Sequence, residues 1–494
     1  MRTRFAPSPT GFLHVGGLRT ALYSYLLAKQ TGGQFLLRIE DTDQERTVEG
    51  AVESIVRSLA WAGISPDEGV MMEDGLVIER GSKGPYIQSR RQATGIYREH
   101  AEQLLASGHA YRCFCTTERL EEMRRQQEAR KQAPMYDRQC LHLPENDVKR
   151  LIEAGTSHVI RLKVPHERTI RFDDDIRGTM TFQGHTVDDQ VLLKSDGFPT
   201  YHLAHVIDDH FMDIDLVLRG EEWLSSLPKH LLLFEYLDWK APRFAHVPLL
   251  LNKDRTKLSK RQNAVSVEEY IAKGYLPEVL LNFLAMLGWN PGTTQETFSL
   301  PELVEQFSLD RVQKSGAVFD LEKLDWLQGQ WIRKIPVTDF AERIRPIVGK
   351  EYPTALHDAD FEQKASLIHE RITFFHEASA MLGYFYEEPG ITTELLANEK
   401  QKVKPEELPT ILTTLLGILE VIPEKDWTPE RLLTDVKGEV AKGTWKLGQL
   451  LWPLRSALTG LPYSPGAVEV AAALEREKTL ARLKRAREIV SALS

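Results

Sequence analysis

Residues 3–40 constrain the fold most strongly, because they combine two strand patterns with a helix pattern between them. Thr3–Ala6 has the composition of a short strand, and Gln34–Glu40 has that of a buried one. Between them, apolar residues recur at helical spacing until Gly32 ends the pattern: Leu18, Ala21, Leu22, Tyr25 and Leu26. A strand, a helix and a second strand in this order predict a parallel sheet of the α/β class.

The alternation of strands and helices does not continue through the whole chain. Residues 111–187 are rich in arginine, glutamate and turn formers, which indicates an insertion between two halves of the sheet domain. Strand patterns return at Val191–Lys194 and Ile214–Leu218. Beyond residue 265 the apolar spacing is almost wholly helical, so we expect an all-α C-terminal region.

Composition sets broad limits on the class of protein. The 494-residue chain carries 62 Lys and Arg against 71 Asp and Glu, so its net charge of −9 neither favours nor excludes a nucleic-acid partner. No apolar run approaches the length of a membrane span, and residues 1–11 contain no charged-then-apolar leader. These features predict a cytoplasmic protein that does not cross a membrane, with about three structural units.

Two short segments carry the strongest functional signal. The first, His14-Val15-Gly16-Gly17, stands where the predicted helix begins, so unpaired backbone N–H groups and the positive end of the helix dipole would face an anion. The second, Lys257-Leu258-Ser259-Lys260-Arg261, places two lysines on a loop after an apolar strand at 248–251. Alone, each segment also fits an ordinary turn, glycine-rich in one case and solvated and charged in the other. Together they predict a site that grips a nucleoside triphosphate.

The same two segments resemble the signatures of class I aminoacyl-tRNA synthetases. Within that class the chain resembles the bacterial and organellar glutamyl-tRNA synthetases. The resemblance rests on Arg4–Gly11, Arg38–Asp43, Lys194–Ala204, Arg219–Trp223, Lys257–Arg261 and Val318–Leu324, and continues more weakly through Pro453–Gly460. It therefore covers nearly the whole chain.

The resemblance implies a fold in several parts. We expect a Rossmann-type parallel-sheet catalytic domain of the α/β class with an inserted acceptor-binding and zinc subdomain, followed by all-α stem-contact and anticodon-binding domains. The expected boundaries are 1–110 for the first half of the catalytic domain, 111–190 for the insertion, 191–250 for the second half, 251–330 for the stem-contact domain with the lysine loop, and 331–494 for the helical anticodon-binding region.

The resemblance also implies a reaction. Such an enzyme activates L-glutamate with Mg²⁺-ATP, releases diphosphate, and transfers the glutamyl group to the 3′ end of tRNA-Glu. No covalent enzyme intermediate is needed, so the protein supplies positioning and charge stabilisation. Catalytic roles would fall on His14, Lys257 and Lys260, and contacts with ATP on Gly16, Gly17, Glu222 and Lys260.

A pocket selective for glutamate needs cations for the side-chain carboxylate and an anion for the ammonium group. The family's glutamate-binding positions correspond to Arg4, Ser8, Glu40, Tyr201, His205 and Arg219. Arg219 favours glutamate over glutamine, because a neutral amide needs no second cation. His205 stands where many relatives have asparagine, so we expect a polar contact with the substrate to be altered or absent there.

The three cysteines of the chain fall in two half-sites, Cys113-Phe114-Cys115 and Cys140-Leu141-His142. Three thiols and one imidazole suit tetrahedral zinc, so Cys113, Cys115, Cys140 and His142 are the predicted ligands of a closed structural site. Three buried free cysteines with a surface histidine are the alternative. Some bacterial members of the resembled family carry zinc at this pattern and others lack the cysteines.

The implied partners are tRNA-Glu, ATP and L-glutamate, and the family suggests a monomer. Basic residues that could position tRNA are Arg124, Arg125, Arg130 and Lys131 in the insertion, and Lys478, Arg482, Lys484, Arg485 and Arg487 near the C-terminus. Charged helix faces are more often simply solvated. The alternatives are a glutaminyl-tRNA synthetase, a truncated glutamyl-queuosine tRNA ligase, and a non-catalytic RNA-binding paralogue. Whether tRNA-Gln is also charged stays open at this point.

Overall fold

The computed structural model of the chain describes residues 1–258 and 265–492. Two compact units divide it, Met1–Leu324 and Asp325–Ser494. The division falls within helix α12 (Leu321–Lys334), whereas the sequence placed a domain boundary after residue 330. In the described part of the chain, no helix has both the length and the apolar character that a membrane crossing requires.

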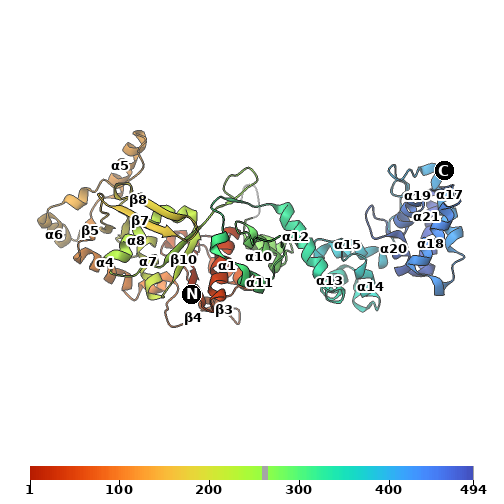
Figure 1. Cartoon of the computed structure of the whole chain (residues 1–494), viewed down its shortest axis with the longest axis horizontal. Helices are drawn as coiled ribbons and strands as arrows, with labels where there is room; N and C mark the ends of the chain where they lie inside the picture. Colours follow the sequence, from red (N-terminus) through yellow and green to blue (C-terminus); the bar gives the residue numbers. More distant parts are fainter. Residues whose placement is uncertain (259–264, 493–494) are drawn as a thin grey trace. The chain divides into compact units, whose positions relative to one another are not determined.

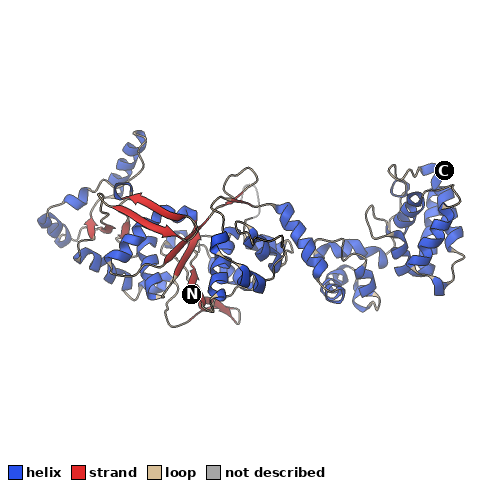
Figure 2. Ribbon diagram, viewed as in Figure 1, coloured by secondary structure: helices blue, strands red, loops and turns tan. Residues whose placement is uncertain are grey.

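A six-stranded sheet lies at the centre of the first unit (Figures 1 and 2). Its strands, in spatial order, are β11 (Arg243–Val247), β10 (Leu216–Gly220), β1 (Arg2–Phe5), β2 (Gln34–Leu37), β3 (Glu68–Glu73) and β4 (Leu76–Arg80). All neighbours pair in parallel except β3 and β4. The chain builds outwards from β1 in both directions, so a crevice opens beyond the carboxyl ends of the central strands.

Helix α1 (Val15–Gln30) connects β1 to β2 and is buried along much of its length. It packs against β1, β2 and β10 on the sheet and against helices α10 (Pro277–Met286) and α11 (Leu300–Gln306). Burial on two sides explains its weakly amphipathic sequence, with Leu18, Leu22 and Leu26 all fully buried. The parallel α/β fold that residues 3–40 predict is confirmed.

The insertion has its own small sheets. Strands β5 (Ala110–Cys113), β6 (Val159–Leu162) and β9 (Val191–Leu193) form an antiparallel sheet, and β7 (Thr169–Asp174) pairs with β8 (Gly178–Gln183) as a hairpin. The sequence did not predict this hairpin. Its strand β7 packs against β11, so the hairpin lies beside the edge strand of the central sheet.

Helices make up most of the remainder of the first unit. They are α2 (Ala51–Trp61), α3 (Gln88–Gln92), α4 (Ile96–Ala106), α5 (Thr117–Ala129), α6 (Glu145–Glu153), α7 (Tyr201–Phe211), α8 (Leu227–Tyr236) and α9 (Val267–Ala272). One short parallel pair, β12 (Leu250–Leu251) with β13 (Ala317–Val318), departs from the helical pattern predicted beyond residue 265. Two residues are too few to show a strand periodicity.

The second unit is helical throughout its described residues (Figure 2). After α12 its helices are α13 (Val337–Glu351), α14 (Phe361–Ser366), α15 (Ala378–Leu382), α16 (Thr393–Leu396), α17 (Leu408–Leu419), α18 (Pro429–Val440), α19 (Leu447–Thr459), α20 (Ala467–Ala473) and α21 (Glu475–Ser491). Helix α17 buries a leucine-rich face against α18, α19 and α21. The predicted all-α C-terminal region is confirmed.

Candidate active site

His14 forms the N-cap of α1. Its backbone is extended (φ −82°, ψ 147°), and its Nδ1 accepts a hydrogen bond from the Gly16 backbone N–H at 2.9 Å. A Cβ at Gly17 would lie 3.0 Å from Leu13 and 3.5 Å from Phe5, so glycine allows the helix start to pack closely on the end of β1. The positive end of the α1 dipole therefore faces the crevice and can act on an anion there.

Backbone hydrogen bonds bring the lysine-bearing segment to the same place. The Val15 N–H donates to the Val265 carbonyl oxygen at 2.9 Å, so the chain returns to the helix start after the lysine loop. Before the loop, the Leu258 N–H donates to the Leu250 carbonyl oxygen at 2.9 Å, next to Lys257. The two segments that carry the strongest sequence signal are therefore neighbours in space.

A cavity of about 770 Å³ opens at this point. It collects ten of the residues that the sequence assigned to ATP, glutamate or catalysis: Arg4, Ser8, His14, Gly16, Gly17, Glu40, Tyr201, Arg219, Glu222 and Lys257. Lys260, the remaining predicted catalytic residue, lies outside the described residues. The cavity has room for a nucleotide and an amino acid side by side.

Ion pairs beneath the cavity fix two of its charged residues. The Arg4 Nε donates to Asp209 at 3.0 Å, and Glu40 accepts from Arg38 at 2.8 Å. Burial raises the pKa of Glu40, but the positive charges of Arg38 and Arg4 and a hydrogen bond with His205 outweigh it and hold the pKa below its usual value. Glu40 is therefore a carboxylate, as an ammonium-binding group must be.

Arg219 is held differently, by neutral partners. Its Nη1 donates to the Tyr201 hydroxyl at 3.0 Å and to His230 Nδ1 at 3.2 Å, and its Nε donates to His246 Nε2 at 3.0 Å. Its Nη2 lies 3.5 Å from the Trp223 carbonyl oxygen. No carboxylate among the described residues makes a salt bridge with Arg219.

His205 lies below the cavity and does not line it. Its ring stacks on Tyr201 with centroids 5.2 Å apart, its Nδ1 lies 3.3 Å from Arg4, and its Nε2 is buried without a hydrogen-bond partner in the described structure. Burial lowers its pKa, so the imidazole is neutral. His205 therefore contacts Tyr201 and Arg4 from below the cavity.

The three cysteines lie together at the end of β5. The sulfurs of Cys113, Cys115 and Cys140 all lie within 4.8 Å of one another. His142, which the spacing predicted as the fourth ligand, is not part of this group. The hydroxyl of Tyr136 lies next to the cluster instead, 3.4 Å from the Cys113 sulfur and 3.3 Å from the Cys115 sulfur. A short helical turn over Gln139–His142 carries Cys140 inwards and does not carry His142 with it.

Several residues of the site were not predicted from the sequence. Thr42, Asp43 and Arg46 line the cavity from the loop after β2, and His230 and His246 hold Arg219 from α8 and β11. Single histidines within apolar helices and strands look like ordinary core residues, so nothing in the local pattern signals these two.

The basic residues named for tRNA contacts divide into two groups. Those in the insertion, Arg124, Arg125, Arg130 and Lys131, are exposed on or just after α5. On α21, Lys478, Lys484 and Arg485 are exposed and Arg487 is half-buried. Arg482, however, is buried and donates to the Leu458 and Glu387 carbonyl oxygens at 2.6 and 3.2 Å. Its role is therefore internal packing, and it is not a phosphate contact.

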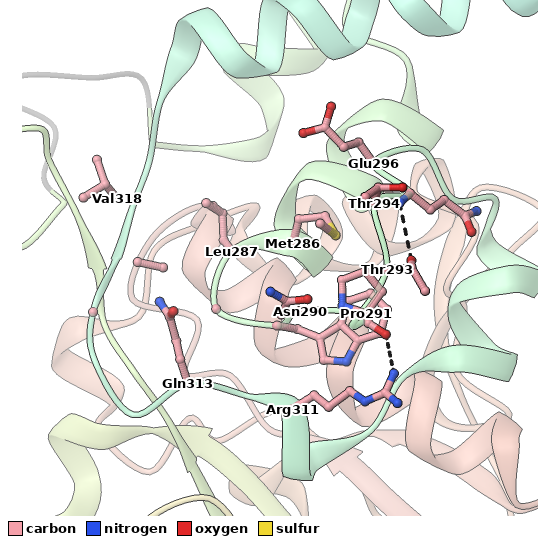
Figure 3. A pocket seen from close by; sticks show the side chains of 15 residues that line it. Met286, Leu287, Asn290, Pro291, Thr293, Thr294, Glu296, Arg311, Gln313 and Val318 are labelled. Carbon is pink, nitrogen blue, oxygen red and sulfur yellow. Dashed lines mark hydrogen bonds between the residues drawn. The ribbon is translucent and has the colours of Figure 1, made fainter.

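A second cavity, of about 620 Å³, shares no lining residue with the first (Figure 3). It is formed by the turns at 286–296 and 311–318, where Arg311 donates to the Pro291 carbonyl oxygen. None of the residues predicted for ATP, glutamate or metal binding lines it. The chemistry that the sequence predicts is therefore concentrated in the first cavity.

Comparison with known proteins gives family matches for both units. Residues 1–326 match the catalytic domain of class I tRNA synthetases (E and Q), and residues 339–487 match an anticodon-binding domain. Two similar curated proteins are a glutamate–tRNA ligase of Prosthecochloris aestuarii, 45% identical over 99% of this chain and 98% of the relative, and one of Chloroherpeton thalassium, 45% identical over 98% and 97%.

Solved structures agree with these relatives. A glutamate tRNA ligase from Elizabethkingia meningosepticum, crystallised in complex with its amino acid, superposes with a TM-score of 0.88 at 36% identity and covers 99% of both chains. The glutamate-tRNA synthetase of Elizabethkingia anophelis gives a TM-score of 0.86, also at 36% identity and 99% coverage of both chains.

Proposed function

This chain belongs to the class I glutamyl-tRNA synthetase family and acts as a glutamate–tRNA ligase, and from that premise we propose how its residues perform the reaction. One observation supports the proposal above all: a single cavity collects the N-terminus of α1, Lys257, two arginines and an ionised glutamate. It therefore offers donors for phosphates, cations for a carboxylate and an anion for an ammonium group.

We assign the phosphate end of the cavity to ATP. His14, Gly16 and Gly17 present the α1 N-terminus, and Lys257 with Lys260 supplies positive charge. Class I synthetases use ATP with Mg²⁺, which neutralises part of the phosphate charge. The α-carboxylate of glutamate attacks the α-phosphorus, the bond to the bridging oxygen breaks, and diphosphate leaves with its electron pair. Glutamyl-adenylate remains, and the enzyme lowers the barrier by alignment and charge stabilisation.

We assign the other end of the cavity to glutamate. Glu40 binds the ammonium group, while Arg219, with Tyr201 beside it, binds the side-chain carboxylate; Arg4 and Ser8 complete the polar wall. A terminal ribose hydroxyl of tRNA-Glu then attacks the carbonyl carbon of the adenylate and AMP leaves. We place the reaction in the cytoplasm and assign it to a monomer, as the family resemblance suggests.

We further propose that the cysteine cluster binds a structural zinc ion. Tetrahedral zinc with sulfur ligands at about 2.3 Å requires sulfurs about 3.8 Å apart, which the spacing of Cys113, Cys115 and Cys140 accommodates. Tyr136 presents the nearest oxygen and is our candidate for the fourth ligand in place of His142. Such an ion would join β5 to the Gln139–His142 turn at the base of the insertion.

ATP–diphosphate exchange tests the assignment of the amino acid. We expect exchange with glutamate and not with glutamine, measured with and without tRNA, because the family usually needs tRNA for activation. Arg219→Gln should raise the KM for glutamate by at least tenfold, since a charged hydrogen bond is worth about 1.5–3 kcal/mol. An unchanged KM for glutamate in that variant would contradict the assignment. Aminoacylation of tRNA-Glu and tRNA-Gln side by side identifies the acceptors.

A further inference from the structure

The guanidinium of Arg219 is held by a set of neutral groups that the established reaction does not explain. Its five N–H groups can only donate, so each ring nitrogen that faces them must be an unprotonated acceptor. His246 Nε2 and His230 Nδ1 both face them, at 3.0 and 3.2 Å. Both imidazoles are fully buried. The two contacts therefore specify which nitrogen of each ring carries the proton.

The second ring nitrogen of His246 has a matching partner. With Nε2 as acceptor, the proton lies on Nδ1, which donates to the Asp174 carboxylate at 2.6 Å. Asp174 is itself fixed by the Ile176 and Arg177 backbone N–H groups at 3.0 and 2.8 Å. It is the last residue of β7, in the hairpin that the insertion lays on the central sheet. The insertion thus reaches the amino-acid pocket through two hydrogen bonds.

His230 forms a similar chain on the other side. With Nδ1 as acceptor, its Nε2 donates to His202 Nδ1 at 3.1 Å. Burial lowers the pKa of His230, and the nearby His205, Arg219, His202 and Lys229 lower it further, so the ring stays neutral. Burial also lowers the pKa of His246, which Asp174 raises and Arg219 and Arg177 lower.

We propose that His246 and His230, with Asp174 behind His246, are positioning residues that aim Arg219 at the side-chain carboxylate of the substrate. They occupy Nε and Nη1 and leave Nη2, whose one contact in the described structure is the 3.5 Å approach to Trp223, as the donor for the substrate. Neutral acceptors also leave the positive charge of Arg219 available, whereas Arg4 is paired with Asp209. The inference rests on the proposed role of Arg219.

Asp174→Asn gives the sharpest test, because the variant changes a proton position and almost no volume. An asparagine amide can donate to His246 Nδ1, which moves the proton to Nε2 and directs an N–H at the Arg219 N–H. The same exchange of carboxylate for amide in a serine protease triad keeps the geometry and leaves the imidazole in the wrong tautomer. We expect the KM for glutamate to rise roughly tenfold or more with the KM for ATP unchanged. Selectivity for glutamate over glutamine should fall with it.

Asp173→Asn is the matched control, since Asp173 is exposed on the same strand and should leave both KM values unchanged. Imidazole ¹⁵N chemical shifts should show His246 protonated on Nδ1 in the wild type and on Nε2 in Asp174→Asn. If Asp174→Asn does not fold, His246→Leu and His246→Gln replace it. The leucine should raise the KM for glutamate, and the glutamine, whose amide oxygen can accept from Arg219, should restore most of the affinity.

The outcomes separate the two proposals. If Arg219→Gln raises the KM for glutamate while folded Asp174→Asn and His246→Leu do not, the positioning role is overturned and the role of Arg219 stands. If Arg219→Gln itself has no effect, the assignment of the carboxylate to Arg219 fails first. A His246 that is protonated on Nε2 in the wild type would also overturn the inference.

Discussion

At the scale of single residues, the two arginines that line the cavity differ in their partners. Arg4 is paired with a buried carboxylate, and Arg219 is surrounded by neutral hydrogen-bond acceptors. A buried cation without an anionic partner is costly, so an incoming carboxylate completes the site where an amide would not. On the proposed role of Arg219, selectivity for glutamate depends on two features of the pocket: the positive charge of Arg219, and the lack of a carboxylate paired with it among the described residues.

Lys260→Ala tests how much the lysine loop contributes to catalysis. We expect a loss of about 3 kcal/mol of transition-state stabilisation in ATP–diphosphate exchange, the order measured for one preorganised donor. Lys253→Ala is the control, because this exposed lysine pairs with Glu322 at 2.8 Å. Near-normal exchange in Lys260→Ala would refute the catalytic role.

Histidines with lowered pKa values make the first unit sensitive to acid, and half-buried His202 is the clearest example. Burial, with the positive charges of Lys229 and Arg219 and the neighbouring His205 ring, lowers the pKa of His202 to about 3. In the unfolded chain a histidine titrates near 6.5, so below that pH the unfolded state binds the extra proton and stability falls with pH. The contribution of His202 to the free energy of unfolding is fully present above pH 6.5 and is lost progressively as the pH falls towards 3.

His202→Asn keeps an acceptor for His230 and removes this titration. We expect the free energy of unfolding of the wild type to fall by about 1.4 kcal/mol more than that of the variant between pH 7.5 and 5.5. Denaturant titrations at the two pH values measure it, and the exposed His185→Asn should leave the difference unchanged. Equal pH slopes for the wild type and His202→Asn would contradict the argument.

At the scale of elements, periodicity predicted the parts of the fold that are governed by local sequence. α1 was predictable from its helical repeat of apolar residues, and β2 from its short continuous apolar run. The β7–β8 hairpin was not predicted although residues alternate in burial along both strands, and its place beside β11 depends on packing between segments far apart in the sequence. The Asp174–His246 and His246–Arg219 contacts join residues 72 and 27 positions apart, beyond the reach of any local pattern.

The cysteine cluster shows the same limit of sequence-based prediction within one short segment. Spacing correctly brought the three cysteines together, but the direction of a side chain after Cys140 depends on the backbone of the Gln139–His142 turn. Tyr136 could be found only from the structure, since tyrosine is not part of the usual zinc spacing patterns.

Zinc analysis of single variants tests this element. We expect about one zinc per chain in the wild type and in His142→Ala, loss of zinc in Cys140→Ser, and weakened binding in Tyr136→Phe, which chelator competition would measure. Cys140→Ser should also lower the thermal stability of the insertion. A metal-free preparation with full activity would refute the site, and loss of zinc in His142→Ala would restore His142 as the ligand.

At the scale of the whole molecule, two units with separate cores predict more than one unfolding transition. The cavity for ATP and glutamate lies wholly within Met1–Leu324. Saturating glutamate and ATP, at one hundred times their dissociation constants, should each stabilise that unit by about 2.7 kcal/mol and leave the other unit unchanged.

Differential scanning calorimetry with and without the ligands measures this effect. Only one transition should move upwards, and Arg219→Gln should reduce the part of the shift that glutamate causes. A shift of both transitions by the same amount would show that the two units unfold together and would contradict the prediction.

The position of Asp174 has a consequence for how such enzymes can change. The segment predicted to approach the acceptor end of tRNA also supplies the group that orients the amino-acid pocket. A chimera that exchanges this segment between enzymes would transplant part of the amino-acid preference along with the RNA preference. Exchange of this one segment would therefore change the specificity for the amino acid and the specificity for the RNA together.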